Sequence, residues 1–249
     1  MMSQDNVPCI AVITVTFNAS KDIARLAQSL AEQTDKNFVW IVKDCCSSDS
    51  TISIVDRYRH FFPLYTIVSQ DNGIYDGLNQ AIQYCKSLFY LTAGADDLLY
   101  PTAIKELNLA LSSDMYSADL YLNRIKIGKK LVEPGRGNGF LFGQHGFAAN
   151  HSVGCLIRKD LHTLVGPYST KLQVAADSLF LYSVCSAGFK LKETRVVAGE
   201  FSIGGVSTSK LLFISHAEFA LVQILNHPRF RFLQIALYAL RLLMNWRQY

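Results

Sequence analysis

Long apolar runs and strong charge are both missing from this chain of 249 residues. No window offers the roughly 18 uncharged apolar residues that a membrane-spanning helix needs. The first residues, MMSQDNVPCIAVITV, have no positively charged start and include Asp5, so we expect a buried strand there rather than a signal peptide. The formal net charge is only +4. A charge that small does not suggest a nucleic-acid binder, and we expect no nucleic-acid partner.

Paired cysteine motifs, internal repeats and low-complexity segments are also missing. None of the six cysteines forms a CxxC motif. Since no export signal is recognised, we expect free thiols and a cytoplasmic location. Apolar residues, in contrast, are abundant and make up 50% of the chain. That fraction excludes a disordered chain and indicates either a large core or a membrane contact.

Two patterns alternate along the first hundred residues. Strands are expected at 9–16, 38–42, 64–68 and 88–91, and helices at 20–33, from 51 onward, at 73–85 and after Pro101. This order predicts an α/β fold with an open, Rossmann-like, mainly parallel sheet flanked by helices. The later pattern is less regular. It indicates a glycine-rich loop at 133–146, a strand at 152–157, a helix at 176–187, a strand at 195–201, and helices near 209–225 and 229–247.

Candidate binding residues, most of them polar, follow the predicted parallel strands, at the edge where ligands bind in such sheets. These residues are Thr16, Phe17 and Asn18, then Asp44, then Asp71, then Asp96 and Asp97. Clustered carboxylates repel each other unless a cation joins them. Mg2+ and Mn2+ take oxygen ligands, often one or two carboxylates together with substrate phosphate. We therefore expect Asp96 and Asp97 to form a metal–phosphate site.

Five segments strengthen this interpretation because they occur together in a particular order and spacing. They are VITVTFNAS, VKDCCSSDST, SQDNGIYDGLNQAI, FYLTAGADDLLYP and VAADSLFLYSV. Together they resemble the family 2 glycosyltransferases of the GT-A fold, in particular bacterial polysaccharide and O-antigen sugar transferases, over about residues 8–206. The resemblance implies a catalytic domain at 1–206, with a nucleotide-sugar half at about 1–100 and an acceptor half at about 101–206. A C-terminal helical extension would follow at 207–249.

The resemblance also implies a role for each strand-end residue. Thr16, Phe17 and Asn18 would line the nucleotide pocket, and Asp44 would bind the base (commonly uracil). Asp71 would close the pocket around the base and ribose. Asp96 would contact the ribose, and Asp97 would bind Mn2+ or Mg2+ on the diphosphate. The chain departs from a full D-x-D motif, since Ala95 stands where the first acid would be.

Two later residues complete the implied site. Asp177 matches the family's general base, which takes a proton from the acceptor hydroxyl as that oxygen attacks the anomeric carbon. Because Asp177 opens a predicted helix, we expect the helix N-terminus to keep its carboxylate ionised. His151, in AANHSVGCLIRKDL, matches a family histidine that would contact a donor phosphate or the acceptor.

Every one of these residues also has a structural alternative. Asn18 can shape a turn, and Asp44 can end a strand or cap a helix. Asp71 can form an Asx-turn with Asn72 and Gly73, and Asp96 and Asp97 can lie in a solvated loop. Asp177 can be an N-cap, and His151 can be a structural histidine whose hydrogen bonds are satisfied within the fold. We expect Tyr75 to pack rather than to take part in the chemistry.

The last thirty residues differ from the rest in their charge. No acid occurs from Phe219 to Tyr249, whereas this segment includes Arg229, Arg231, Arg241 and Arg247. The helix expected at 229–247 is amphipathic, with a wide apolar face. Its basic and aromatic residues suit an anionic membrane surface. The alternative is that this face packs on the catalytic domain or forms a homodimer.

Together these features predict an inverting, metal-dependent glycosyltransferase. It would move a sugar from a nucleotide-diphosphate sugar, with UDP favoured, to a hydroxyl of a glycan or lipid-linked glycan at the inner face of the cell membrane. One rival is a nucleotidyltransferase, which usually has a glycine-rich basic loop after its first strand, unlike TFNASKD. The other is a catalytically silent, membrane-associated assembly subunit, which would bind the donor without turnover.

Overall fold

The computed structural model describes residues 7–134, 152–202 and 212–245. The strands are β1 Ile10–Thr16, β2 Phe38–Asp44, β3 Leu64–Val68, β4 Phe89–Thr92, β5 Leu98–Leu99, β6 Leu120–Ile127, β7 Lys130–Val132, β8 Cys155–Arg158 and β9 Leu191–Phe201. The helices are α1 Ile23–Ala31, α2 Thr51–Asp56, α3 Ile74–Tyr84, α4 Ala103–Ser113, α6 Leu161–Leu164, α7 Ala176–Ser186, α9 Leu212–Asn226 and α10 Arg231–Asn245. Short 3-10 turns lie at Ser152–Gly154 and Pro228–Phe230.

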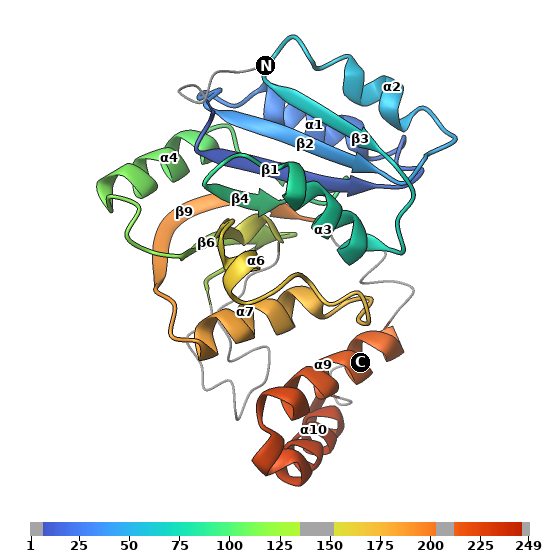
Figure 1. Ribbon diagram of the computed structural model, residues 1–249, viewed down its shortest axis with the longest axis vertical. Helices are drawn as coiled ribbons and strands as arrows, with labels where there is room; N and C mark the ends of the chain where they lie inside the picture. The colour runs from blue at the N-terminus through green and yellow to red at the C-terminus, as the bar shows by residue number, and fades with distance from the viewer. Residues whose placement is uncertain (1–6, 135–151, 203–211, 246–249) are drawn as a thin grey trace.

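One sheet joins all of these strands, in the order β3-β2-β1-β4-β8-β6-β9-β5, with β7 paired to β6 (Figure 1). The first four strands in this order are parallel. Antiparallel pairing begins at β8, which lies between β4 and β6. The predicted α/β fold with helices flanking a mainly parallel sheet is confirmed, and its parallel part is the half predicted to bind the donor.

The core lies in two layers, one on each face of the sheet. Leu26 of α1 and Trp40 of β2 belong to one layer, and Ile13 of β1 and Phe180 of α7 belong to the other. Helices α1 and α4 thus cover one face and α3 and α7 the other. Because β1 and β2 are covered on both sides, their sequences are nearly continuous apolar runs, which explains why they were predictable.

The second half of the sheet shows where the sequence pattern was less informative. Strand β6 was not predicted, and β9 begins at Leu191 rather than at the expected residue 195. Asn123 interrupts the apolar pattern of β6, yet it is wholly buried and its Oδ1 accepts a 2.6 Å hydrogen bond from the hydroxyl of Thr194 in β9. In the sequence alone, a polar residue at such a position is typical of a loop. Its place in a strand becomes clear only when the partner strand is known.

Helices α9 and α10 form a pair that projects from the body of the molecule beside α7 (Figure 1). Val222 of α9 is buried in the same core layer as Phe180 of α7, so α9 packs on the catalytic domain. On α10, in contrast, Phe232, Leu233 and Ile235 are exposed. Among the residues that the structure describes, no helix combines the length and the apolar character needed to cross a membrane.

Candidate active site

The carboxyl ends of the parallel strands meet at one edge of the sheet, as expected. Thr16 at the end of β1 pairs with Asp44 at the end of β2, and Asp44 pairs with Val68 at the end of β3. Strand β4 lies parallel to β1 on its other side (Figure 1), so its carboxyl end points to the same edge. Asp96 and Asp97 lie in the turn that follows β4. Four segments far apart in the sequence therefore surround one region.

Asp44 organises the turns at this edge. Its carboxylate is wholly buried and accepts hydrogen bonds from the Thr16 hydroxyl at 2.8 Å, from the Ser47 hydroxyl at 2.6 Å and from the Ser47 N–H at 2.7 Å. Asn18 has a positive φ of 50° and donates its N–H to the Ser47 hydroxyl. Asn18 thus shapes a turn and Asp44 ends β2, as two of the structural alternatives predicted, whereas the N-cap of α2 is Ser50 and not Asp44. Phe17, which lies between Thr16 and Asn18 in the chain, has 65% of its surface exposed.

Asp71 is held by Lys43, a residue that the sequence analysis missed. The Lys43 side chain is wholly buried, and its Nζ donates to Asp71 Oδ2 at 2.6 Å and to the Ser69 carbonyl at 2.7 Å. A buried charge is tolerated when it is paired in this way. Asp71 Oδ1 also accepts the N–H of Gly73, which forms the predicted Asx-turn. The available signal was a lysine at the end of the otherwise apolar strand FVWIVKD.

Asp96 and Asp97 fold around the backbone of Gly94. A Cβ at Gly94 would lie 2.8 Å from Asp96 Oδ1 and 3.1 Å from Asp97 Oδ2, so any side chain there would displace both carboxylates. Asp97 is buried, and its two oxygens accept the N–H groups of Gly94 and Ser202. Asp96 is only half-buried. These two carboxylates supply hard oxygen ligands of the kind that Mg2+ and Mn2+ prefer.

A complete protein cage for a metal is absent from the described residues, which hold no cluster of three or more His, Cys, Asp or Glu side chains able to bind one ion. Mg2+ in nucleotide sites commonly uses one or two carboxylates and completes its shell with phosphate and water. The pair of Asp96 and Asp97 therefore fits a metal that enters with the donor diphosphate.

Asp177 lies in the first turn of α7 and is linked to α3. Its Oδ1 accepts the N–H of Ser178 at 2.7 Å and lies 3.1 Å from the hydroxyl of Tyr75, in the first turn of α3. The same hydroxyl lies 2.6 Å from the carbonyl oxygen of Val174 and shares its proton between the two acceptors. Since α3 directly follows the turn formed by Asp71, this contact brings the start of α7 to the strand-end region.

The environment of Asp177 corrects one expectation from the sequence. Burial raises the pKa of this carboxyl, and the hydrogen bonds from Ser178 and Tyr75 oppose that rise only in part. We had expected the helix N-terminus to keep this carboxylate ionised. Burial instead has the larger effect on its pKa. Ala175 occupies the N-cap position of α7, so the N-cap alternative for Asp177 does not apply. A carboxylate with a raised pKa is a better proton acceptor once it is ionised.

One predicted site residue, His151, lies outside the described residues, and so does most of the glycine-rich loop at 133–146. The remaining predicted residues are brought to one edge of the sheet or, for Asp177, linked to it through α3.

Comparison with known proteins decides the family. The sequence profile of Glycosyl transferase family 2 matches residues 11–185, well over half of the chain. The chain belongs to glycosyl transferase family 2. The matched range begins in β1 and ends in α7, so it includes both the strand-end acids and Asp177.

Several curated members of this family are similar in sequence. A PGL/p-HBAD biosynthesis glycosyltransferase of Mycobacterium tuberculosis is 25% identical over 68% of this chain and 67% of its own length. Chondroitin synthase of Escherichia coli is 29% identical over 47% of this chain, and the poly(ribitol-phosphate) beta-N-acetylglucosaminyltransferase TarS of Staphylococcus aureus is 31% identical over 47%. The matched segment makes up only 16% of chondroitin synthase and 21% of TarS.

Solved structures of glycosyltransferases have the same fold. The structure of S. aureus TarS 1–349 in complex with UDP-GlcNAc superimposes with a TM-score of 0.72 at 19% identity, over 96% of this chain and 72% of that one. The mannosyltransferase PcManGT from Pyrobaculum calidifontis, in complex with GDP-Man and Mn2+, superimposes with a TM-score of 0.61 at 17% identity, over 96% and 75%. The predicted GT-A fold is confirmed.

Proposed function

We propose that this family 2 glycosyltransferase is an inverting enzyme with Asp177 as its general base. It moves a sugar from a nucleotide-diphosphate sugar, a UDP-sugar by preference, to a hydroxyl of a glycan or lipid-linked glycan. The observation that carries this proposal is the position of Asp177, whose carboxylate is bonded to Tyr75 at the start of the helix that follows the strand-end turn. Its raised pKa favours proton uptake from an acceptor hydroxyl.

The donor would bind across the ends of β1, β2 and β3. Thr16 and Asn18 shape this surface, and Asp44 holds its turns in place. The exposed ring of Phe17 offers a flat apolar face to a nucleotide base, and Asp71 lies in the turn that follows β3. The choice of UDP is supported by the UDP-GlcNAc bound to the similar TarS structure, whereas PcManGT binds GDP-Man.

Asp96 and Asp97 are the residues that would hold a divalent metal on the donor diphosphate. Mn2+ or Mg2+, when bound, would offset the charge of the leaving diphosphate. The role of the chain is to keep the two carboxylates together around Gly94 and to anchor Asp97 through the N–H of Ser202, at the end of β9. In this arrangement Asp96 is the more accessible carboxylate for the ribose or the metal.

The acceptor and the membrane contact rest on the C-terminal helical pair. The exposed apolar residues of α10 lie next to Arg229 and Arg231, and no acid follows Glu218 in the chain. Such a face suits the surface of an anionic membrane, where a lipid-linked acceptor would be available. We propose peripheral contact with the inner face of the cell membrane.

The decisive experiment offers the purified protein a panel of nucleotide sugars with lipid-linked glycan acceptors and detects products by mass spectrometry. We expect transfer from one donor, with inversion at the anomeric carbon. Asp177→Asn should bind that donor with unchanged affinity and lose at least about a hundredfold in kcat, because the amide cannot accept the hydroxyl proton. Full activity in Asp177→Asn removes Asp177 from the base role. Donor binding by wild type without any turnover supports the silent-subunit alternative.

The metal assignment is tested separately by calorimetry with UDP. We expect Mn2+ to strengthen UDP binding by about tenfold or more in wild type and not in Asp97→Ala. Asp35→Ala is a control, since this carboxylate precedes β2, away from the strand ends, and accepts hydrogen bonds from Asn37 and Asn108. Equal UDP affinity with Mn2+ and with a chelator, in wild type as in Asp97→Ala, contradicts the metal role.

A further inference from the structure

Glu218 of α9 carries a buried carboxylate that binds the chain just before α7. Its side-chain oxygens accept three backbone hydrogen bonds, from the N–H groups of Gln173 at 2.7 Å, Val174 at 2.7 Å and Ala175 at 3.0 Å. The residue is only 8% exposed. A buried charge is costly unless it is compensated, and three charge-assisted bonds provide that compensation here.

The three bonded amides lie directly before the proposed base. Ala175 is the N-cap of α7, and Asp177 lies two residues further along. The carbonyl of Val174 is also the 2.6 Å partner of the Tyr75 hydroxyl. The Glu218 carboxylate therefore fixes the N–H of a peptide segment whose carbonyl orients Tyr75, and Tyr75 in turn contacts Asp177.

We propose that Glu218 is a positioning residue for Asp177. Helix α9 then contributes to the geometry of the active site. This inference rests on the proposed role of Asp177 as the base. It extends the site by a residue that lies outside the range matched by the family profile, which ends at residue 185. It also links the C-terminal helices, through the backbone of residues 173–175, to the proposed base.

The charges around Asp177 allow this role to be separated from simple stabilisation of the fold. Asp177 interacts with Tyr75 from α3, with Glu218 from α9, with Cys155 from β8 and with Tyr168 from the segment before α7. Of these, Glu218 carries the negative charge, and that charge raises the pKa of Asp177. Loss of the charge must therefore lower the pKa of Asp177 and extend activity to lower pH.

The test compares Glu218→Gln with wild type in the pH dependence of kcat/KM, using the donor that the panel selects. We expect kcat to fall by about tenfold or more with donor KM within twofold, because a displaced base misaligns with the acceptor while the strand-end residues are untouched. We also expect the acidic limb to move to lower pH, because the Glu218 charge that raises the pKa of Asp177 is lost. Glu218→Asp keeps the charge with a shorter reach, so it should lower kcat with the acidic limb unchanged.

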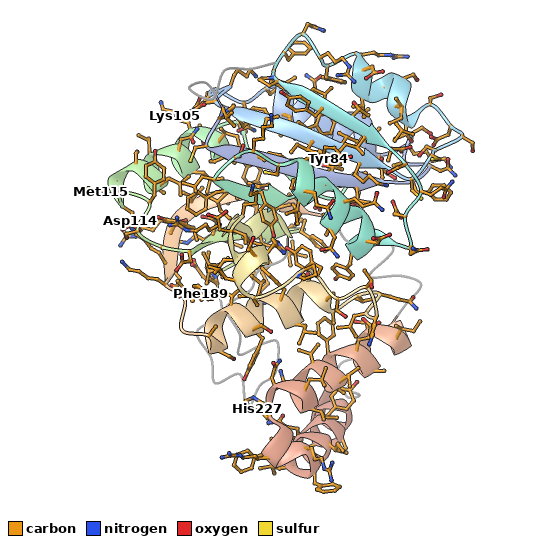
Figure 2. The ribbon with its side chains drawn as sticks, in the orientation of Figure 1. Tyr84, Lys105, Asp114, Met115, Phe189 and His227 are labelled. Carbon is orange, nitrogen blue, oxygen red and sulfur yellow. The ribbon has the colours of Figure 1, made fainter. Side chains whose placement is uncertain are left out.

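A matched control breaks a polar contact between α7 and the residue that follows α9. The hydroxyl of Tyr182 lies 2.7 Å from His227 Nε2, and His227 is labelled beside the helical pair in Figure 2. Tyr182→Phe weakens the docking of the pair without touching residues 173–175. We expect kcat within about twofold of wild type and an unmoved acidic limb in this variant.

Hydrogen exchange supplies a readout that needs no catalysis. The amides of Gln173, Val174 and Ala175 should exchange about tenfold or more faster in Glu218→Gln, and unchanged in Tyr182→Phe. The inference is overturned if Glu218→Gln keeps wild-type kcat and exchange, or if Tyr182→Phe reproduces its kcat loss. Absence of transfer in wild type would instead refute the proposed function, while the exchange result would still stand.

Discussion

Tyr75 shows how one residue can serve packing and chemistry together. The sequence predicted a packing role, and the ring is indeed buried, at 7% exposed. Its hydroxyl, however, lies against both Val174 and Asp177, and burial together with the Asp177 charge raises the pKa of Tyr75 well above its ordinary value. The phenol therefore remains protonated and acts as a hydrogen-bond donor to the proposed base.

Tyr75→Phe should move the acidic limb of kcat/KM to higher pH. The hydroxyl stabilises the ionised form of Asp177, so its removal raises the pKa of that carboxyl further. Because the base must be ionised to act, activity is then lost at a higher pH as the solution is acidified. A pH–rate profile measures this shift, which is opposite in sign to the shift expected for Glu218→Gln.

Tyr84→Phe is the control for that variant. Tyr84, labelled in Figure 2, lies in the last turn of the same helix. Its side chain is 63% exposed. We expect its pH profile to match wild type. An acidic limb that stays in place in Tyr75→Phe would contradict the proposed contact between the hydroxyl and Asp177.

The residues of the site differ in how far the sequence could reveal them. Thr16, Asp44 and Asp71 were predictable because parallel strands in register bring the residues that follow them to one edge. Lys43 and Glu218 were not, since each is recognisable only through a partner distant in the chain. A buried charge in an apolar element looks like an irregularity until the group that compensates it is located.

At the scale of elements, α3 connects the donor edge to the start of α7, and its distance from the sheet depends on Gly77. A Cβ at Gly77 would lie 2.7 Å from Val15 Cγ1 and 3.2 Å from Asp71 Oδ2. Helical glycine is otherwise unfavourable by about 1 kcal/mol relative to alanine. The close approach of α3 to β1 thus explains a glycine in the middle of this helix.

Gly77→Ala should lower the free energy of unfolding by about 1–2 kcal/mol, because overpacking outweighs the better helix propensity. It should also weaken UDP binding, since the new methyl group presses on Asp71. Chemical denaturation and calorimetry measure the two effects. The double variant Gly77→Ala, Val15→Ala makes room for the methyl group and should recover most of the stability. A stabilised single variant would show that α3 can shift without cost.

Elements of the second half were harder to derive from the sequence than those of the first. Strands β1 to β4 are apolar runs that alternate with helices, which specifies a parallel sheet. Strand β6 is central too, but its buried Asn123 is bonded to Thr194, a partner 71 residues away. Local periodicity carries no information about such a pairing, so the strands of the second half could not be derived from the sequence.

At the scale of the whole molecule, charge is distributed unevenly although the net value is small. Acids gather at the strand ends, while the chain after Glu218 has none. The C-terminal pair is anchored through α9 and leaves apolar residues of α10 open to solvent. Between residues 230 and 240, the exposed large apolar residues are Phe230, Phe232, Leu233, Ile235 and Leu240. Of the two contributions that the apolar composition allowed, the large core is present, and the exposed apolar residues of α10 mark where the proposed membrane contact would form.

This arrangement predicts binding to anionic vesicles. We expect the protein to float with vesicles of phosphatidylglycerol and phosphatidylcholine, to bind pure phosphatidylcholine several-fold more weakly, and to lose the difference in high salt. Arg231→Glu should weaken anionic binding by about tenfold, since each basic residue near the surface contributes about 1 kcal/mol and reversal adds repulsion.

Lys105→Glu makes the same change of charge at a distant position. Lys105 is exposed on α4, far from the C-terminal pair in Figure 2. We expect its vesicle binding to equal that of wild type, because the interaction depends on where the cations lie and not on their total. Equal losses in both variants would indicate a general charge effect. A dimer in sedimentation that is disrupted by Phe232→Ser, without vesicle binding by wild type, would assign the exposed face of α10 to a second copy of the chain.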